Sequence, residues 1–125
     1  MSFQNQFTKT TTDANLMETV HHGSAEYPFR YYYENITLFD FKCIDWHWHS
    51  ELEFIYIESG NVVFDIGTVH FELNEGNGIM INSKILHRLQ SSSDAIIPNF
   101  LFQPSFIAPQ DSLIYKKYIN PVISS

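Results

Sequence analysis

The sequence lacks the features that mark secreted, membrane and fibrous proteins. Its 125 residues include five glycines, five prolines and one cysteine, Cys43, so neither an internal disulfide framework nor a low-complexity chain is indicated. No apolar run reaches the roughly 18 residues that a membrane-spanning helix needs, and no signal peptide is recognisable. We therefore expect one globular domain in the reducing cytoplasm, without a membrane partner.

Basic residues are also scarce. Seven lysines and arginines stand against 14 aspartates and glutamates, which gives a formal net charge of -7. A field of this sign repels phosphate backbones and anionic lipid, so we expect no direct binding of nucleic acid by these residues. Aromatic side chains are abundant instead, with 11 phenylalanines and 7 tyrosines. At this length they suffice to build a core.

The first 25 residues are polar and predict an N-terminal arm. A short helical patch is expected over residues 14–22, with Asp13 as its cap and Gly23 at its end. His21 and His22 fall within this patch, where neighbouring side chains point about 100° apart and do not readily share a metal ion. We therefore expect them to lie at a solvated helix end.

Residues 26–110 consist of short apolar and aromatic runs separated by turn residues, a pattern typical of an all-β sandwich or barrel. Turns are expected at Ser59-Gly60-Asn61, at Gly67-Thr68 and around Gly76. The expected strands are Phe29–Tyr33, Ile36–Ile44, Leu52–Glu58, Val62–Ile66, Val69–Leu73, Gly78–Ile81, Leu86–Leu89 and Ile96–Phe102.

Residues 111–125 predict a short C-terminal helix. Asp111 precedes it, and Pro121 is expected to stop it. Its apolar positions Ile114, Tyr115, Tyr118 and Ile119 fall on one helical face.

Two histidines and a glutamate in residues 47–53 have the spacing of metal ligands. In a strand, residues two apart lie on one face about 6.6 to 6.8 Å apart, so His47 and His49 can aim at one point, and Glu53 keeps their parity. His87 follows a later turn. Three imidazoles and one carboxylate suit a divalent transition metal such as Zn, Ni, Mn or Fe, and suit Ca or Mg poorly. Such a set leaves one or two coordination positions open.

This spacing resembles the motifs of the cupin superfamily. The order His47-x-His49-x-x-x-Glu53 is similar to the first motif, and Gly76 followed by His87 is similar to the second. The chain departs from the first motif at Phe41, where the family has glycine. It departs from the second at three positions, where the family has proline, glycine and asparagine: Asn82, Lys84 and Ser91.

A closer resemblance covers residues 27–125 and concerns the N-terminal sensing domain of AraC-type transcription regulators. The strings that carry it are Tyr27-Pro28-Phe29, His47-Trp48-His49, Leu52-Glu53-Phe54-Ile55-Tyr56, Gly76-Asn77-Gly78-Ile79-Met80-Ile81-Asn82 to Leu86-His87, Gln103-Pro104-Ser105-Phe106 and Ile114-Tyr115-Lys116-Lys117-Tyr118-Ile119-Asn120-Pro121. The resemblance implies a cupin-like double-stranded β-helix, or jelly-roll barrel, that binds a small effector, often a sugar. It also implies an N-terminal arm that closes over the effector, helices that support a homodimer, and a C-terminal pair of helix-turn-helix units that binds DNA.

Those DNA-binding units do not fit in 125 residues. We therefore expect the sensing half of a longer regulator: an arm over residues 1–25, a barrel over 26–110, and a helix with the start of a linker over 111–125. DNA would be contacted only through the absent helix-turn-helix domain.

The predicted metal set His47, His49, Glu53 and His87 has plainer interpretations. The histidines could hydrogen-bond effector hydroxyls, or buried neighbours such as Glu53 and Tyr56 could satisfy them. Residues expected to contact an effector are Tyr31, Tyr33, Trp46 and Trp48, which could stack on a sugar ring, and Ile55 and Ile57, which would form an apolar wall. Equally, such side chains could simply fill the core.

Two other functions stay open from the sequence. A stand-alone metal-dependent cupin enzyme, such as a dioxygenase or isomerase, would use the open metal positions, but it also needs a positioned acid or base, for which the β region offers few candidates. A small sugar- or metal-binding module without catalysis is the other. An effector-binding domain that is not an enzyme is the interpretation that the residues favour.

Overall fold

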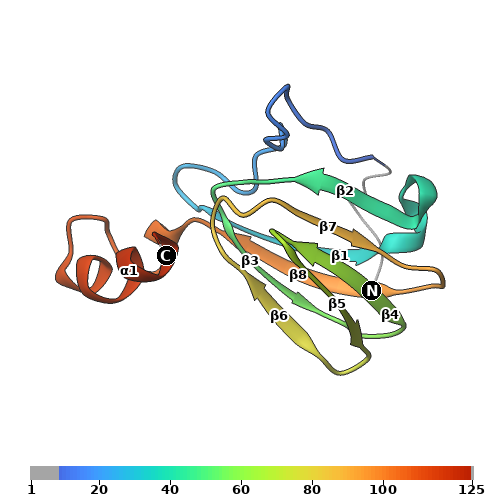
Figure 1. Cartoon of the computed structure of the whole chain (residues 1–125). Helices are drawn as coiled ribbons and strands as arrows, with labels where there is room; N and C mark the ends of the chain where they lie inside the picture. The colour runs from blue at the N-terminus through green and yellow to red at the C-terminus, as the bar shows by residue number, and fades with distance from the viewer. Residues whose placement is uncertain (1–8, 125) are drawn as a thin grey trace.

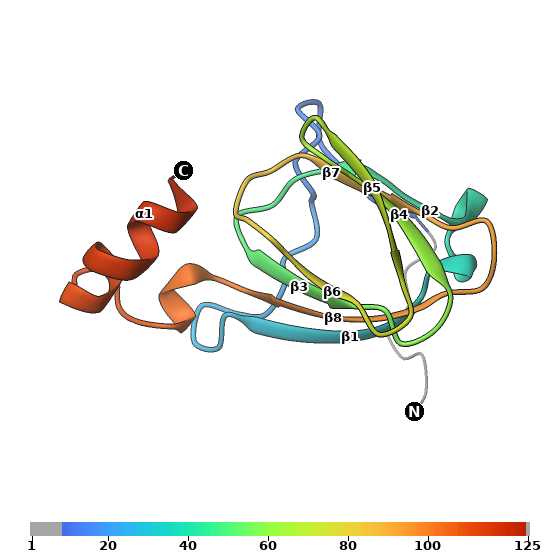
Figure 2. The same cartoon turned by 60° about the horizontal axis from the view of Figure 1, so that its bottom comes forward.

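The computed structural model describes residues 9–124 of the chain. Eight strands form two four-stranded sheets that pack face to face, with every strand pair antiparallel (Figures 1 and 2). The sheet orders are β1-β8-β3-β6 and β2-β7-β4-β5. The strands are β1 (Phe29–Asn35), β2 (Cys43–His47), β3 (Leu52–Tyr56), β4 (Asn61–Ile66), β5 (Val69–Asn74), β6 (Gly78–Ile81), β7 (His87–Gln90) and β8 (Ile96–Phe102). The expected all-β class is confirmed.

The core lies between the two sheets, where inward residues of both meet. Ile55, Ile57 and Phe64 have no exposed surface, and Ile81 and Leu89 retain 1% each. These residues alternate with outward ones along their strands, as the period of two requires. Their burial fixes the register of the strands, because a slip by one residue would turn every core side chain to the opposite face.

The expected strand Ile36–Ile44 is wrong over most of its length. Two 3-10 turns, Ile36–Leu38 and Asp40–Lys42, occupy it, and β2 begins only at Cys43. The Asn35 carboxamide oxygen accepts from the Thr37 amide at 3.0 Å and so starts the first turn. The segment looks like a strand in sequence because it is rich in apolar residues, of which Ile36 and Phe39 are buried in the core.

The expected helix over residues 14–22 is also wrong. Asp13 does cap, but it caps a tight loop: its carboxylate accepts from the amides of Asn15 at 2.8 Å and Met17 at 3.0 Å. Leu16 takes a positive φ of 66° within that loop. Because these local bonds replace helical ones, the arm stays extended and runs beside the end of β2 (Figure 1).

The predicted turn at Gly60 is confirmed by its backbone. Gly60 has a φ of +85°, and a Cβ there would lie 2.2 Å from the carbonyl oxygen of Asp94. Only glycine fits such a close approach without a backbone shift. The turn leads directly into β4.

The C-terminal segment is helical, with a π-helix at Tyr115–Ile119 followed by α1 (Asn120–Ile123). Ser112, rather than Asp111, caps it, because the Ser112 hydroxyl accepts from the Tyr115 amide at 3.1 Å. Pro121 does not stop the helix. Helical backbone continues through it to Ile123. No helix of residues 9–124 is long and apolar enough to cross a membrane.

Candidate metal centre

The four residues predicted to bind a metal come together at one end of the sandwich. His47 ends β2 and pairs directly with His87 at the start of β7, while Glu53 lies on β3 of the other sheet. His49 sits on the short connection between β2 and β3. The set therefore joins the two sheets across the core.

A β-bulge in β2 gives His47 its direction. Ile44 pairs with Leu89 and His47 pairs with His87, so β2 has one residue more than β7 between the two pairs. In a regular strand Ile44 and His47 would face opposite sides. The extra residue restores their phase, and both side chains are buried, at 9% and 4% exposure.

The candidate ligand atoms are close enough to share one ion. One atom from each of the four residues lies within 4.8 Å of all the others. His49 Nε2 is 3.0 Å and His87 Nε2 is 3.4 Å from Glu53 Oε1. Two ligands about 2.1 Å from one ion are ~3 Å apart at a right angle and ~4 Å apart when opposite. The set thus needs only a slight contraction to coordinate a metal.

Each histidine of the set is held by the same backbone device. The Nδ1 atoms of His47, His49 and His87 lie 2.7, 3.0 and 2.8 Å from carbonyl oxygens two residues away. Because a carbonyl only accepts, each Nδ1 carries a proton and donates it. The Nε2 atoms are then free to bind an ion. Metal-bound imidazoles in proteins usually have the same arrangement, with one ring nitrogen on the metal and the other donating to a backbone carbonyl or carboxylate.

His87 shows most clearly that the residues fit a metal. Its side chain is fully buried, and Nε2 is the only buried side-chain nitrogen or oxygen in residues 9–124 that lacks a hydrogen-bond partner. The neighbouring Glu53 oxygen, although close enough for an ion pair, does not make that bond. A buried unsatisfied polar atom costs about 1 to 3 kcal/mol, and a metal–nitrogen bond would remove that cost.

The electrostatics of the set point the same way. Burial by itself raises the pKa of Glu53, but the hydrogen bond from His49 and the charges of the imidazoles outweigh it and hold that pKa well below its usual range. Burial lowers the pKa of His49, yet the Glu53 carboxylate more than reverses this and raises it to about 9. Burial and His87 lower the pKa of His47 to about 4. Near neutral pH and without metal, the His49 imidazolium thus faces the Glu53 carboxylate, and His47 is neutral.

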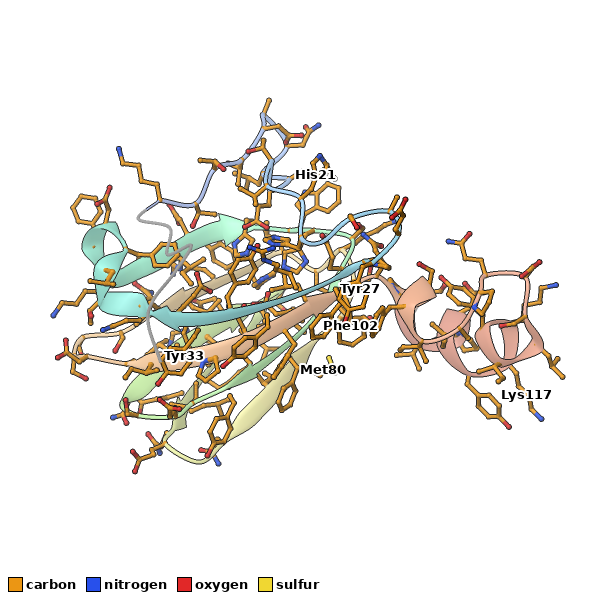
Figure 3. The ribbon with its side chains drawn as sticks, turned by 180° about the vertical axis from the view of Figure 1, so that it is seen from behind. His21, Tyr27, Tyr33, Met80, Phe102 and Lys117 are labelled. Atoms are coloured by element: carbon orange, nitrogen blue, oxygen red, sulfur yellow. The ribbon has the colours of Figure 1, made fainter. Side chains whose placement is uncertain are left out.

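A small cavity opens beside this set, between the sheets and under the arm. Its volume is about 40 Å³, room for roughly three water molecules at 10 to 15 Å³ each. Nitrogen atoms gather in this part of the molecule below the arm (Figure 3). The cavity is lined by the arm residues Lys9, Thr10, Thr11, Glu18, Val20 and His22, and by Tyr32, Glu34, Phe39, Ile44, His47, His49, Glu53, Leu89, Asn99 and Leu101.

The sequence did not predict the role of His22. It is 7% exposed, with its ring 5.9 Å from that of His49, so the expectation of a solvated helix end is wrong for this residue, whereas His21 is exposed. His22 Nε2 donates to Glu18, and Nδ1 lies 2.7 Å from Tyr32 Oη. No local sequence pattern could reveal the hydrogen-bonded series Glu18–His22–Tyr32, because it forms only where the extended arm meets β1.

Glu34 was also missed. Its carboxylate accepts from Asn99 Nδ2 at 2.7 Å and faces the cavity from β1. Burial raises the pKa of Glu34 to about 7, against the opposing effect of the Asn99 bond. The cavity therefore has two carboxyl groups, Glu18 and Glu34, outside the metal set.

The aromatic residues expected to contact an effector lie elsewhere in the structure. Tyr31 and Tyr33 are on the outward face of β1, because Tyr32 and Glu34 take the inward one. Because β1 carries aromatic residues on both faces, its sequence has no alternation of polar and apolar residues from which the inward face could be predicted. The β1 residues that line the cavity are Tyr32 and Glu34.

The other four expected contacts also lie outside the cavity lining. The ring of Trp46 lies under the Arg88 guanidinium, 4.9 Å from its carbon. Trp48 donates from Nε1 to the Asn15 carbonyl at 2.9 Å and so holds the arm. Ile55 and Ile57 belong to the hydrophobic core. The apolar wall of the cavity is formed by other residues, among them Ile44 and Leu89.

Two antiparallel sheets with this set between them define a cupin-like domain, and solved structures have the same fold. A cupin-2 domain containing protein from Shewanella frigidimarina matches with a TM-score of 0.53, at 13% identity over 61% of this chain and 72% of that one. A protein from Neisseria meningitidis matches with a TM-score of 0.52, at 14% identity over 61% of this chain and 75% of that one.

Within the cupin fold, residues 38–108 match the AraC-like ligand binding domain, and the chain belongs to that family. A curated relative, the uncharacterized HTH-type transcriptional regulator YdeC of Bacillus subtilis, is 32% identical over 115 residues, which is 90% of this chain. The chain spans 39% of the length of that relative. The resemblance found in the sequence is confirmed.

Proposed function

We propose that this domain senses a small effector for an AraC-type transcription regulator, and that its cavity takes a divalent transition metal at His47, His49, Glu53 and His87. The observation that carries the metal is that one ligand atom from each of the four residues lies within 4.8 Å of the others, while each histidine is fixed by an Nδ1–H bond to the backbone. A bound Zn, Ni, Mn or Fe ion would supply a Lewis acid with open positions toward the cavity.

The cavity also favours a class of effector. Glu18 adds a negative charge beside the metal set, and Glu34, whose pKa is about 7, adds a partial one near neutral pH. Lys9 is the one lysine or arginine among the lining residues, and its amine lies 3.9 Å from Asp40. Carboxylates accept hydrogen bonds and repel anions. The effector that fits is thus uncharged or cationic and rich in donors, of which a sugar is one example.

The arm limits the size of that effector. Its residues form one side of a cavity that holds only a few water-sized groups. A ligand the size of a sugar ring requires the arm to move outward. Such a ligand binds only the open position of the arm, so it would shift the equilibrium between the closed and the open position toward the open one. Sensing would then consist of this change in arm position.

The regulatory partners follow from the proposed family role. We place the arm in residues 1–25, the barrel in 26–110, and the helix with the start of a linker in 111–125. DNA would be bound by a helix-turn-helix domain outside these 125 residues, since the negative charge of this chain disfavours contact with phosphates. Two copies would form a homodimer in the cytoplasm.

Metal content is the direct test of the site. The domain is loaded with Zn, Ni, Mn or Fe, dialysed against buffer and measured by mass spectrometry, alongside His47→Ala and the control His70→Ala, whose side chain is 68% exposed. We expect one equivalent in the wild type and in His70→Ala, and none in His47→Ala. Absence of metal under every loading condition would overturn the metal proposal while leaving an effector cavity to be tested with ligands.

One observation keeps an enzyme as the second candidate. The chain Glu18–His22–Tyr32 places an imidazole with an oriented proton beside the metal set, which is the acid or base that a metal-dependent dioxygenase or isomerase would need. Turnover of donor-rich substrates by the metal-loaded domain, lost in His22→Ala while metal stays bound, would favour the enzyme. Binding without turnover would favour the sensor.

A further inference from the structure

Trp48 lies in the sequence between two of the four candidate ligands, and the arm is hydrogen-bonded to it at three points. The Trp48 amide donates to the Leu16 carbonyl at 3.0 Å, and the Trp48 carbonyl accepts from the Glu18 amide at 2.9 Å. The indole Nε1 donates to the Asn15 carbonyl at 2.9 Å. Every hydrogen-bonding group of Trp48 therefore holds the arm against the segment that carries these two ligands.

A second set of contacts joins the arm to the ligand His49. The ring of His22 lies edge-on to that of His49, with the centroids 5.9 Å apart. His49 Nδ1 donates to the Glu51 carbonyl at 3.0 Å, and the Glu51 carboxylate accepts from the His22 amide at 3.4 Å. Hydrogen bonds and packed side chains of this kind carry coupling between sites. The position of the arm and the orientation of the ligands are thus physically connected.

The docked arm leaves room for an ion with its waters, but not for a sugar ring. The cavity beside the ligands has a volume of about 40 Å³, which holds roughly three water molecules. A larger organic ligand can enter only when the contacts of the arm with Trp48 break. Of these two kinds of effector, the ion is the one that fits the arm in its docked position.

Charge favours the same position of the arm. A divalent ion held by three neutral imidazoles and one carboxylate leaves the set with a net positive charge. The arm residue Glu18 lines the same cavity, and opposite charges attract more strongly where water is excluded. Lys9, the one lysine of the arm that lines the cavity, has its amine 3.9 Å from Asp40. A bound ion therefore draws Glu18, and the arm with it, toward the barrel.

We propose that the transition metal is itself the effector of this domain, and that Trp48 transmits its binding to the arm. The proposal rests on the metal site and the sensor role proposed above, and it names the effector. Binding of the ion fixes His47 and His49, and so stabilises the docking of the arm on Trp48 between them. The linkage is reciprocal, because a docked arm raises the affinity for the ion by the factor by which the ion favours docking.

The test is hydrogen exchange at single amides of the 125-residue chain, followed by NMR with and without saturating zinc and with no organic ligand. The amides of Glu18 and Trp48 bridge the arm and the barrel, so we expect zinc to slow exchange at both by at least about fivefold. The Lys116 amide donates to Ser112 in the C-terminal segment, which extends away from the arm (Figure 1). Its exchange should be unchanged.

Two neighbouring tryptophans provide a matched pair of variants. Trp48→Phe removes the indole bond to the arm and keeps an aromatic ring. Trp46→Phe makes the same change at a ring that lies under Arg88, and both positions adjoin His47 in the sequence. We expect the Kd for zinc, measured by competition with a chelator, to rise about three- to tenfold in Trp48→Phe and to stay unchanged in Trp46→Phe. Circular dichroism and thermal unfolding verify that each variant is folded.

The outcomes separate this proposal from the metal site itself. Bound zinc with unchanged exchange at Glu18 and Trp48 would overturn the proposal and leave the ion as a fixed part of the cavity. Equal slowing at Lys116 would show general stabilisation instead of docking, and equal Kd values in the two variants would exclude Trp48 as the link. Elemental analysis of the same samples shows whether zinc is bound, and a domain that binds no metal would overturn both proposals.

Discussion

His47 and His87 face each other across the β2–β7 ladder, with ring centroids 4.2 Å apart, because a bulge in β2 turns His47 into the core. Both imidazoles are buried, and both donate Nδ1–H to a carbonyl two residues away. The candidate ligands are therefore oriented before any ion binds. Such pre-organisation lowers the cost of binding.

Replacing His87 should separate stability from metal binding. His87→Leu removes the buried Nε2 that has no hydrogen-bond partner, but it also removes the Nδ1–H bond to the Ile85 carbonyl. The two effects oppose each other, so we expect the free energy of unfolding of the metal-free domain to change by no more than about 1 kcal/mol. The gain in stability on adding zinc or nickel should disappear. Urea unfolding with and without metal measures both quantities, with His70→Leu as the exposed control. A metal-free variant that is several kcal/mol less stable would contradict this account.

Metal affinity should depend on pH. The pKa of His49 is raised to about 9 by the Glu53 carboxylate, so at pH 7 an entering ion must displace a proton. Apparent affinity should rise by about tenfold per pH unit between pH 7 and 9 and then level off. Calorimetry in buffers of different ionisation enthalpy should detect about one proton released at pH 7. An affinity that is constant over this range would show that His49 is not a ligand.

The same pair affects the metal-free domain in the opposite direction. The folded-state pKa of His49 lies above its ordinary value of 6.5. Its contribution to stability is fully present below about pH 6.5 and is lost as the pH rises through 9. We expect the unfolding midpoint of the metal-free protein to fall over that interval. In the variant Glu53→Gln the fall should be much smaller, since the charge partner is gone.

The strand pattern could be predicted from the sequence because it rests on a period of two. The same period pointed to the right ligands for a different reason from the one the structure shows, since a bulge directs His47, His49 lies on the connection after β2, and Glu53 lies on the other sheet. That period failed where a strand carries apolar residues on both faces. Tyr31 and Tyr32 look equivalent, and only the pairing of β1 with β8 decides that Tyr32 faces the cavity. The prediction for His22 was wrong for another reason, because this residue follows the loop that Asp13 closes and is not part of a helix. Long-range placement of this kind leaves no local signal.

Glu34 should make the domain less stable as the pH rises. Burial raises its folded-state pKa from 4.5 to about 7, so the favourable, protonated state is present below about pH 4.5 and is lost as the pH rises through 7. Glu34→Gln keeps an acceptor for Asn99 without the charge. We expect it to be more stable than the wild type at pH 8, by on the order of 1 to 3 kcal/mol, and equal at pH 5. Glu72→Gln, at an exposed position of β5, serves as the control. Equal stabilities at pH 8 would mean that Glu34 is solvated.

The last prediction concerns how the arm is held. Asp13 accepts from the amides of Asn15 and Met17, and the loop that it closes lets the Trp48 amide donate to Leu16 and the Glu18 amide donate to Trp48. Asp13→Ala removes the side-chain acceptor, at a cost of ~1 kcal/mol by analogy with helix caps. We expect faster hydrogen exchange at the Glu18 amide and no change in the core strands.

Because Glu18 and His22 cover the cavity, a looser arm should also release bound metal faster, with little change in the four ligands themselves. Stopped-flow transfer of metal to a chelator measures this rate. Asp111→Ala is the matched control, since Asp111 is exposed and does not cap the C-terminal helix. Faster exchange at Glu18 with unchanged metal release would show that the arm covers the cavity without gating it, and effector entry would then need another route.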